Sequence, residues 1–139
     1  MAVTKHVMAL DVGERRIGVA LASLDAQLPS PHGVIDPLEV PAAVVRLIDT
    51  YNVTALIIGL PRGLEGQETA QTKAVRQFKD KLTETIDIPC YFQDEALTSI
   101  EAKTELEERK ARYTKEAVDA LAATFILRDW LSEQRKVVV

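Results

Sequence analysis

Two apolar runs separated by a short polar turn, within residues 6–23, constrain the fold of this chain more than any other feature. Residues 6–11 and 16–23 are largely apolar at successive positions, which is typical of strands buried on both faces of a sheet. The interval between them contains Gly13 and suits a hairpin. The sequence therefore predicts an antiparallel pair of buried strands, with the carboxylate of Asp11 at the end of the first.

The rest of the chain alternates between strand and helix patterns. Short runs bounded by Pro and Gly predict further strands over 33–35, 53–60 and 88–93. Apolar residues at helical spacing, and a capping box at Thr98 and Glu101, predict helices over 38–51, 68–85, 98–110 and 114–134. This order predicts an α/β fold with a mixed five-stranded sheet, its first three strands antiparallel, flanked by helices. No repeat or linker divides the 139 residues, so we expect one domain over 1–139.

Composition and charge exclude several classes of protein. The chain carries 17 Lys and Arg against 21 Asp and Glu, a formal charge of −4, which argues against a protein that coats polyanions indiscriminately. An enzyme with a local basic surface remains compatible with this balance. Cys90 is the single cysteine, so an internal disulfide and a cysteine-rich zinc site are excluded. No apolar run reaches the roughly 20 residues of a membrane span, and the first residues lack a signal-peptide pattern, so we expect no membrane association and a cytoplasmic location.

Four acidic residues lie where acids are unexpected. Asp11 ends the first predicted strand, Asp94 and Glu95 follow the last one, and Asp119 lies on an apolar helix face. A carboxylate on an apolar face loses hydration and needs a partner, which is an arginine, a backbone N–H or a cation. Strand ends and a helix flank can meet at one edge of a sheet. Three carboxylates that meet there repel one another unless a cation neutralises them.

The chemistry of such a set points to divalent metal ions. Hard oxygen ligands in this number select Mg²⁺ or Mn²⁺ over Zn²⁺. Two such ions about 4 Å apart stabilise the attacking and leaving oxygens of a phosphodiester displacement. Only His6 and His32 are available as histidines, and they have no ligand spacing. The acids therefore favour metal-assisted hydrolysis over covalent catalysis.

Each acid also has a purely structural interpretation. Asp11 can form an Asx turn, and Asp94 or Glu95 can favour the N-terminal dipole of the helix that follows. Asp119 can pair with Lys115, four residues earlier on the same helix. The whole set favours a shared site, whereas spacing alone leaves both interpretations open.

Four segments, LDVGERRIGVALA, IIGLPRGLEGQ, QDEALTSIEA and VDALAATFIL, resemble in this order the signature blocks of the YqgF/RuvX family. The resemblance implies an RNase H-like fold and the metal-dependent nuclease activity of pre-16S rRNA nucleases and Holliday-junction-resolvase-like enzymes. It also implies that Asp11, one of the pair Asp94 and Glu95, and Asp119 are catalytic metal ligands. We prefer Glu95, because successive strand residues face opposite sides and only one of the two points inward.

The third block departs from the family pattern, which usually reads Asp-Glu-Arg. Ala96 stands in place of the arginine. An arginine there can hold a phosphate or orient a carboxylate bidentately, and alanine does neither. The departure weakens the expectation of tight substrate binding and leaves the three acids intact.

Two further segments are candidates for substrate binding. Arg15 and Arg16 follow the first acid, and arginine suits phosphate recognition. A solvated turn and, for Arg16, a structural ion pair are the alternatives. The loop after the 53–60 strand contains Arg62, Gly63 and Gly66; glycines let backbone approach a ligand closely, and the resemblance favours a substrate loop over an ordinary connection.

The sequence thus predicts a nuclease that uses two Mg²⁺ or Mn²⁺ ions to hydrolyse phosphodiesters in structured nucleic acid. The expected reaction is 5′-end processing of pre-16S rRNA, resolution of Holliday-junction-type DNA, or both, by a monomer or a weak homodimer. A non-catalytic nucleic-acid- or ribosome-associated protein with a degenerate site is the alternative. An actin- or sugar-kinase-like nucleotide-binding module is more distant, because those proteins need two such domains.

Overall fold

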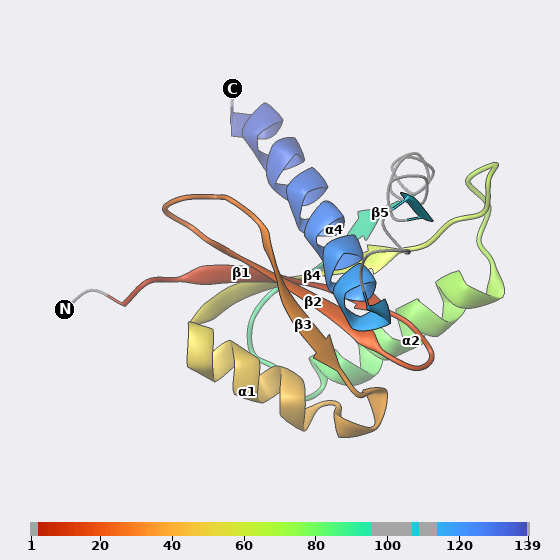
Figure 1. The fold of residues 1–139 in the computed structure, drawn as a ribbon, viewed down its shortest axis with the longest axis horizontal. Helices are drawn as coiled ribbons and strands as arrows, with labels where there is room; N and C mark the ends of the chain where they lie inside the picture. Colours follow the sequence, from red (N-terminus) through yellow and green to blue (C-terminus); the bar gives the residue numbers. More distant parts are fainter. Residues whose placement is uncertain (1–2, 96–106, 109–113, 139) are drawn as a thin grey trace.

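One mixed sheet of five strands organises the chain, and the computed structural model describes residues 3–95, 107–108 and 114–138. The strands run in the order β3-β2-β1-β4-β5 across the sheet. β1, β2 and β3 are antiparallel neighbours, whereas β1, β4 and β5 are parallel (Figure 1). Their bounds are β1 His6–Val12, β2 Ile17–Ser23, β3 Ser30–Ile35, β4 Val53–Leu60 and β5 Cys90–Asp94. The predicted α/β class and mixed five-stranded sheet are therefore confirmed.

The third strand is longer than the sequence pattern indicates. A strand over 33–35 was expected, but β3 begins at Ser30 and includes Pro31. This is possible because β3 is at the edge of the sheet, where a residue without an N–H breaks no ladder on its outer side. The fifth strand also differs slightly, since it covers Cys90–Asp94 instead of 88–93.

Besides the helical residues 107 and 108, the described part of the chain contains three α-helices and one 3₁₀ turn: η1 Pro37–Glu39, α1 Ala42–Tyr51, α2 Ala70–Thr83 and α4 Lys115–Val138. The helix expected from residue 38 starts at Ala42 because Val40 precedes Pro41 and is held extended. The helix expected from 68 starts at Ala70, since Thr69 caps it in a capping box with Thr72. The predicted helix 98–110 and its capping box lie outside the described residues, apart from helical residues 107 and 108.

The two faces of the sheet are covered by different helices. Residues such as Leu10 and Ile58 pack with Val44 of α1 and Leu82 of α2 in one core cluster. The alternate residues of the strands pack against α4 in a second cluster, made of Val7, Ala9, Ala20, Ala22, Ala55, Ile57, Ala123, Ile126, Leu127 and Leu131. We call this second side the α4 face, and Figure 1 shows α4 crossing the strands. Many of its strand residues are alanines, which lets α4 lie close to the sheet.

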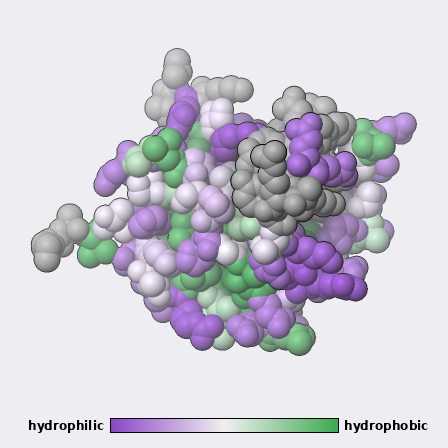
Figure 2. All heavy atoms as spheres, in the orientation of Figure 1, coloured by the Kyte–Doolittle hydropathy of each residue, from purple (hydrophilic) through white to green (hydrophobic). Residues whose placement is uncertain are grey.

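The exterior is mostly polar. In the view of Figure 2 hydrophobic residues show mainly in small patches, one of them over the turn that precedes α1. Leu38 in η1 is 92% exposed. Among the described helices, none combines the length and the apolar character that crossing a bilayer requires.

Candidate active site

The structure brings Asp11 and Asp119 together, although 107 residues separate them in the chain. Asp11 lies directly opposite Gly18 in the β1–β2 ladder. The backbone of Asp119 packs against this glycine so closely that a Cβ on Gly18 would come within 2.0 Å of the Asp119 carbonyl oxygen. Asp11 has the strand parity of Val7 and Ala9, so it faces α4. The missing side chain at Gly18 therefore allows the two acids to be neighbours.

Burial and the neighbouring acid together make the Asp11 carboxyl a weaker acid than the carboxyl of an exposed aspartate. Loss of solvation on burial raises the pKa of the Asp11 carboxyl to about 6, and the negative charge of Asp119 raises it as well. A carboxylate held in this way is stabilised when a cation comes near it. The pair of acids is thus suited to hold positive charge.

Asp119 already has one cationic neighbour. The Nε of Arg16, immediately before β2, donates a hydrogen bond to Asp119 Oδ2 at 2.5 Å. This contact raises the pKa of the Arg16 guanidinium, chiefly through the hydrogen bond. The structural ion pair considered for Arg16 is therefore present, and it replaces the alternative pairing of Asp119 with Lys115. Arg15, beside it in the turn, is exposed.

Glu95 lies on the same face of the sheet. Leu10 pairs with Ile58 in the parallel β1–β4 ladder, so the next residues along, Asp11 and Gly59, are neighbours on strands about 4.8 Å apart. The carboxyl carbon of Glu95 is 2.9 Å from where a Cβ of Gly59 would be. The Glu95 carboxyl thus lies over Gly59, next to Asp11. Its backbone N–H continues the sheet by donating to Leu60 O at 3.2 Å.

Asp94 faces the other way. Its neighbour Gln93 has the opposite parity and hydrogen-bonds Glu133 of α4 at 3.0 Å. Asp94 instead lies 3.3 Å from the Nε of Arg62, in the loop after β4. Strand alternation thus sends the two adjacent acids to different sides of the sheet. Arg62 is held against β5 by Asp94.

The three acids do not form a complete metal-binding site in this conformation. Within the residues that the structure describes, no group of three or more His, Cys, Asp and Glu side chains is arranged to hold a metal ion. The hydrogen bond from Arg16 engages one oxygen of the Asp119 carboxylate. The arrangement supplies two adjacent acids, Asp11 and Asp119, with Glu95 beside them on the α4 face.

The backbone N–H groups of Gly63 and Gly66 donate hydrogen bonds within the β4–α2 loop. Gly63 N–H donates to Gln67 O at 2.8 Å, and Gly66 N–H donates to Gly63 O at 2.9 Å. Gly66 has a φ of 82°, which a glycine adopts without strain. The next helix is tied to the same loop, since the Thr72 hydroxyl donates to Pro61 O at 2.5 Å. The loop is therefore a closed turn that positions Arg62, and it offers neither glycine amide to a ligand in this conformation.

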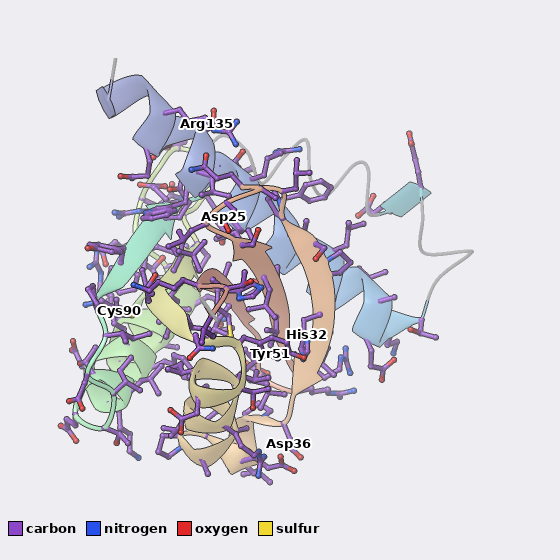
Figure 3. The ribbon with its side chains drawn as sticks, turned by 90° about the vertical axis from the view of Figure 1, so that its left-hand side faces the viewer. Asp25, His32, Asp36, Tyr51, Cys90 and Arg135 are labelled. Atoms are coloured by element: carbon purple, nitrogen blue, oxygen red, sulfur yellow. The ribbon has the colours of Figure 1, made fainter. Side chains whose placement is uncertain are left out.

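The two histidines have structural partners away from the acids. His6 is at the opposite end of β1 from Asp11, and its Nδ1 donates to the Tyr51 carbonyl at 2.8 Å. The ring of His32 meets the Tyr51 ring edge-on at 5.2 Å. Both residues are labelled in Figure 3. Neither histidine is placed to exchange a proton at the site of the acids.

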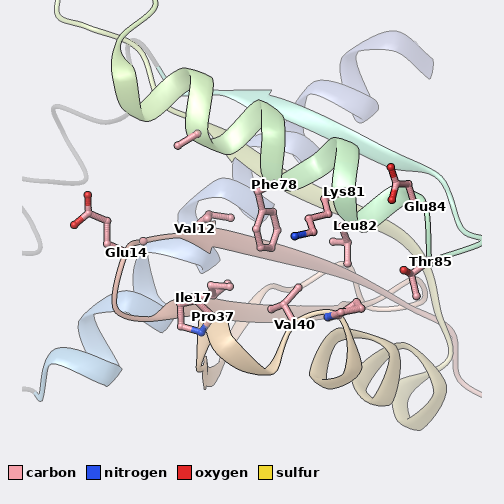
Figure 4. A pocket seen from close by; sticks show the side chains of 13 residues that line it. Val12, Glu14, Ile17, Pro37, Val40, Phe78, Lys81, Leu82, Glu84 and Thr85 are labelled. Carbon is pink, nitrogen blue, oxygen red and sulfur yellow. The ribbon is translucent and has the colours of Figure 1, made fainter.

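A cavity of about 460 Å³ lies on the opposite face of the sheet. Phe78 and Leu82 of α2 line one wall, and Val40 and Pro37 line the other (Figure 4). Its floor includes Ile17, whose parity is opposite to that of the acids. The cavity is thus separated from the candidate active site by the thickness of the sheet.

Sequence reasoning missed the two glycines that bring the site together. Gly18 makes room for Asp119, and Gly59 makes room for Glu95. The available signal was a glycine inside each of two strongly apolar strand patterns, which indicates close approach of another group. Which group approaches depends on how α4 and the end of β5 pack, and periodicity does not contain that information.

Comparison with known proteins gives a consistent result. Residues 5–133 match the model of a family described as RuvX, Holliday junction resolvase. A protein of Roseiflexus sp. is 45% identical over 94% of this chain and 96% of its own length. Relatives from Chloroflexus aurantiacus and Crocosphaera subtropica are 37% and 36% identical over 93% and 95% of this chain, and 88% and 96% of their own lengths. All three carry the name "Putative pre-16S rRNA nuclease".

These matches cover nearly the whole chain, and the order and direction of the five strands are those of the RNase H-like fold. The chain therefore belongs to the RuvX family.

Proposed function

We propose that this protein is a divalent-metal-dependent nuclease that hydrolyses phosphodiester bonds in structured nucleic acid, with Asp11, Asp119 and Glu95 as its catalytic acids. The observation that carries the proposal is the pairing of Asp11 with Asp119 across Gly18, which leaves a largely desolvated carboxyl with a pKa of about 6 beside a second acid. Maintaining two acids in such a place costs stability, and it is a common property of sites that bind cations.

The donor set fits a hard divalent cation. Every candidate ligand is a carboxylate oxygen. A bound cation would relieve the repulsion between the negative charges of Asp119 and Asp11. We infer that the ions are Mg²⁺ or Mn²⁺ and that two are used. When bound, such ions supply the activation of water and the stabilisation of the leaving oxygen that phosphodiester hydrolysis requires. Nucleases of this kind generally use divalent metals, in agreement with this inference.

The protein's own residues then have separate tasks. Asp11 and Asp119 provide the negative charge, and Arg16 orients Asp119 through one oxygen, leaving the other for a ligand. Glu95 adds a third acid from the β5 end of the sheet. Arg15, exposed in the β1–β2 turn, is proposed to contact a substrate phosphate.

The substrate follows from the names of relatives and not from the site alone. We propose cleavage at the 5′ end of a 16S rRNA precursor, or of branched DNA, as the activities to test. A protein that resolves a two-fold symmetric junction is expected to act as a dimer. The oligomeric state of the protein when it is bound to each substrate therefore distinguishes the two activities.

The deciding experiment compares variants of neighbouring acids. Purified protein is incubated with a 16S rRNA precursor fragment and with a four-way DNA junction, each with Mg²⁺ or Mn²⁺. We expect Asp11→Asn and Glu95→Gln to lower kcat by about 100-fold or more, since each removes a charge used in the transition state. Asp94→Asn is the matched control: it neutralises the adjacent acid on the other face, and a loss of less than about tenfold is expected.

If Asp94→Asn abolishes cleavage while Glu95→Gln does not, the assignment of the third acid is wrong. A second candidate function is supported by Ala96, which stands where the family usually has an arginine and which lies outside the described residues. It is a nucleic-acid-binding protein without catalysis, and binding of either substrate with no cleavage by wild-type protein would establish it.

A further inference from the structure

A stripe of four basic residues starts at the end of the sheet where β4 and β5 end, and it follows α2 on the face of the sheet opposite to the candidate acids. It consists of Arg62, in the loop after β4, and of Lys73, Arg76 and Lys79 on the helix. The three helical members are spaced by three residues, so they are neighbours on the helix surface. We call these four residues the basic stripe. In a chain with a formal charge of −4, such a local excess of positive charge is a distinct feature.

Three members of the stripe, Arg62, Lys73 and Arg76, lie near the carboxylate of Glu68. The pKa of the Glu68 carboxyl is lowered, first by a hydrogen bond from Arg76 and then by the charges of Arg76, Arg62 and Lys73. The Arg76 Nε to Glu68 Oε1 distance is 2.7 Å. One exposed carboxylate thus interacts electrostatically with three cationic side chains from two elements. Residues of the β4–α2 loop and of α2 therefore share one positive region.

The far end of the stripe is organised by an aromatic ring. The Arg76 guanidinium carbon lies 5.5 Å from the centroid of the Phe92 ring, and Lys79 Nζ lies 5.1 Å from it. Cation–π attraction keeps both side chains beside this ring of β5. Two like charges at such a spacing repel each other, and an anion bound between them would relieve the repulsion.

Acids do not neutralise the whole stripe. Arg76 is paired with Glu68, and Arg62 with Asp94. Within the part of the chain that the structure describes, no acid lies within salt-bridge distance of Lys73 or Lys79. These two lysines are therefore available to a partner that brings its own negative charge.

We propose that the basic stripe binds the phosphate backbone of a double-stranded arm of the substrate, leading away from the cleavage site. The inference rests on the proposed nuclease function for the position of the substrate. α2 starts at the end of the sheet where β4 and β5 end near Glu95, and it runs away from there. Lys73 to Lys79 spans about 9 Å along the helix, the length of two to three phosphates of one strand of B-DNA.

Contacts of this kind recognise charge and not sequence, so the stripe serves DNA and RNA duplexes alike. Each phosphate contact contributes about 0.9 to the slope of log K against log salt on B-DNA. At 0.1 M monovalent salt, the loss of one contact therefore weakens binding by about eightfold, and the loss of two by about 60-fold.

The test separates binding from cleavage by using Asp11→Asn as the common background. Fluorescence anisotropy measures the Kd of a labelled four-way DNA junction and of an RNA hairpin at several salt concentrations. The double variant Lys73→Gln/Lys79→Gln should bind the junction about 60-fold more weakly at 0.1 M salt, with a slope less steep by about 2. Lys73→Arg/Lys79→Arg keeps both charges and should restore binding.

Lys81→Gln is the matched control. This lysine is on the same helix and exposed, but it lines the cavity on the other side of α2, so its loss should change Kd by less than twofold. A Lys73→Gln/Lys79→Gln protein with unchanged Kd and salt slope would overturn the proposal. So would a loss of affinity no larger than that of Lys81→Gln. If binding falls as expected but wild-type protein cleaves neither substrate, the stripe stands and the proposed nuclease function fails.

Discussion

Adding a single methyl group at Gly18 is a strong test of how this site is built. In the Gly18→Ala protein the new Cβ would be 2.0 Å from the carbonyl oxygen and 2.5 Å from the carbonyl carbon of Asp119. Both atoms belong to the backbone of α4, so a change of rotamer does not relieve the contact. The helix must move away from the sheet by about 1 Å or more before the atoms reach a normal separation.

Two effects of different size follow from this displacement. Overpacking of this kind costs about 1–3 kcal/mol, which a domain with about 5–15 kcal/mol of stability survives. Catalysis should suffer far more, because Asp119 moves with the helix relative to Asp11. A misplacement of about 1 Å in a catalytic group can cost about 100-fold in rate. We therefore expect a folded protein with about 1% of the wild-type activity.

The assay combines urea unfolding with cleavage under conditions where both proteins are folded. With a urea m-value of about 2 kcal/mol/M, the expected loss shifts the midpoint down by about 1 M. Val19→Ala is the matched control, since Val19 is the next residue of β2, is fully buried, and faces the opposite core. It should lose about 2 kcal/mol of stability and keep its activity per folded molecule.

A Gly18→Ala protein with wild-type cleavage would contradict this expectation, because the close approach of α4 would then not be needed. An equal loss of activity in Val19→Ala would refute it as well, since general destabilisation would then explain the effect.

Three further predictions concern the acids and the core. The folded-state pKa of Asp11, about 6, is above its ordinary value of 3.8, so its contribution to the stability of metal-free protein is greatest at low pH and is lost as the pH rises from about 4 through 6. Asp11→Asn should remove this loss and stabilise the metal-free protein by up to about 3 kcal/mol at pH 8, measured by urea unfolding in EDTA; a destabilised variant would contradict this. Arg16→Gln should raise the pKa of Asp11 further, because the charge of Asp119 is then less neutralised, and an NMR titration of Asp11 that shows no upward shift would count against the ion pair. Leu82→Ala should cost about 2–5 kcal/mol, because Leu82 is 2% exposed in the cluster between α2 and the sheet, and a midpoint in urea close to that of the wild type would show that the site collapses.

The elements and several of their details follow from the amino-acid pattern alone. Two apolar runs around Gly13 predicted the hairpin of β1 and β2, and a run of β-branched residues predicted β4 with its bounds. Strand alternation predicted that Asp94 and Glu95 face opposite sides of the sheet, as they do. These features depend on the local period of the backbone, which a sequence pattern reports directly.

Which side chains meet depends on how the elements pack in the folded chain. Arg16 and Asp119 are 103 residues apart, and their contact depends on how α4 packs over the alanines of β1 and β2. The pKa of Asp11 and the approach of Asp119 to Gly18 depend on the same packing. The basic stripe depends likewise on the docking of α2 against β5. Contacts of this kind are set by the shape of two packed surfaces, and that shape does not exist until distant segments have come together.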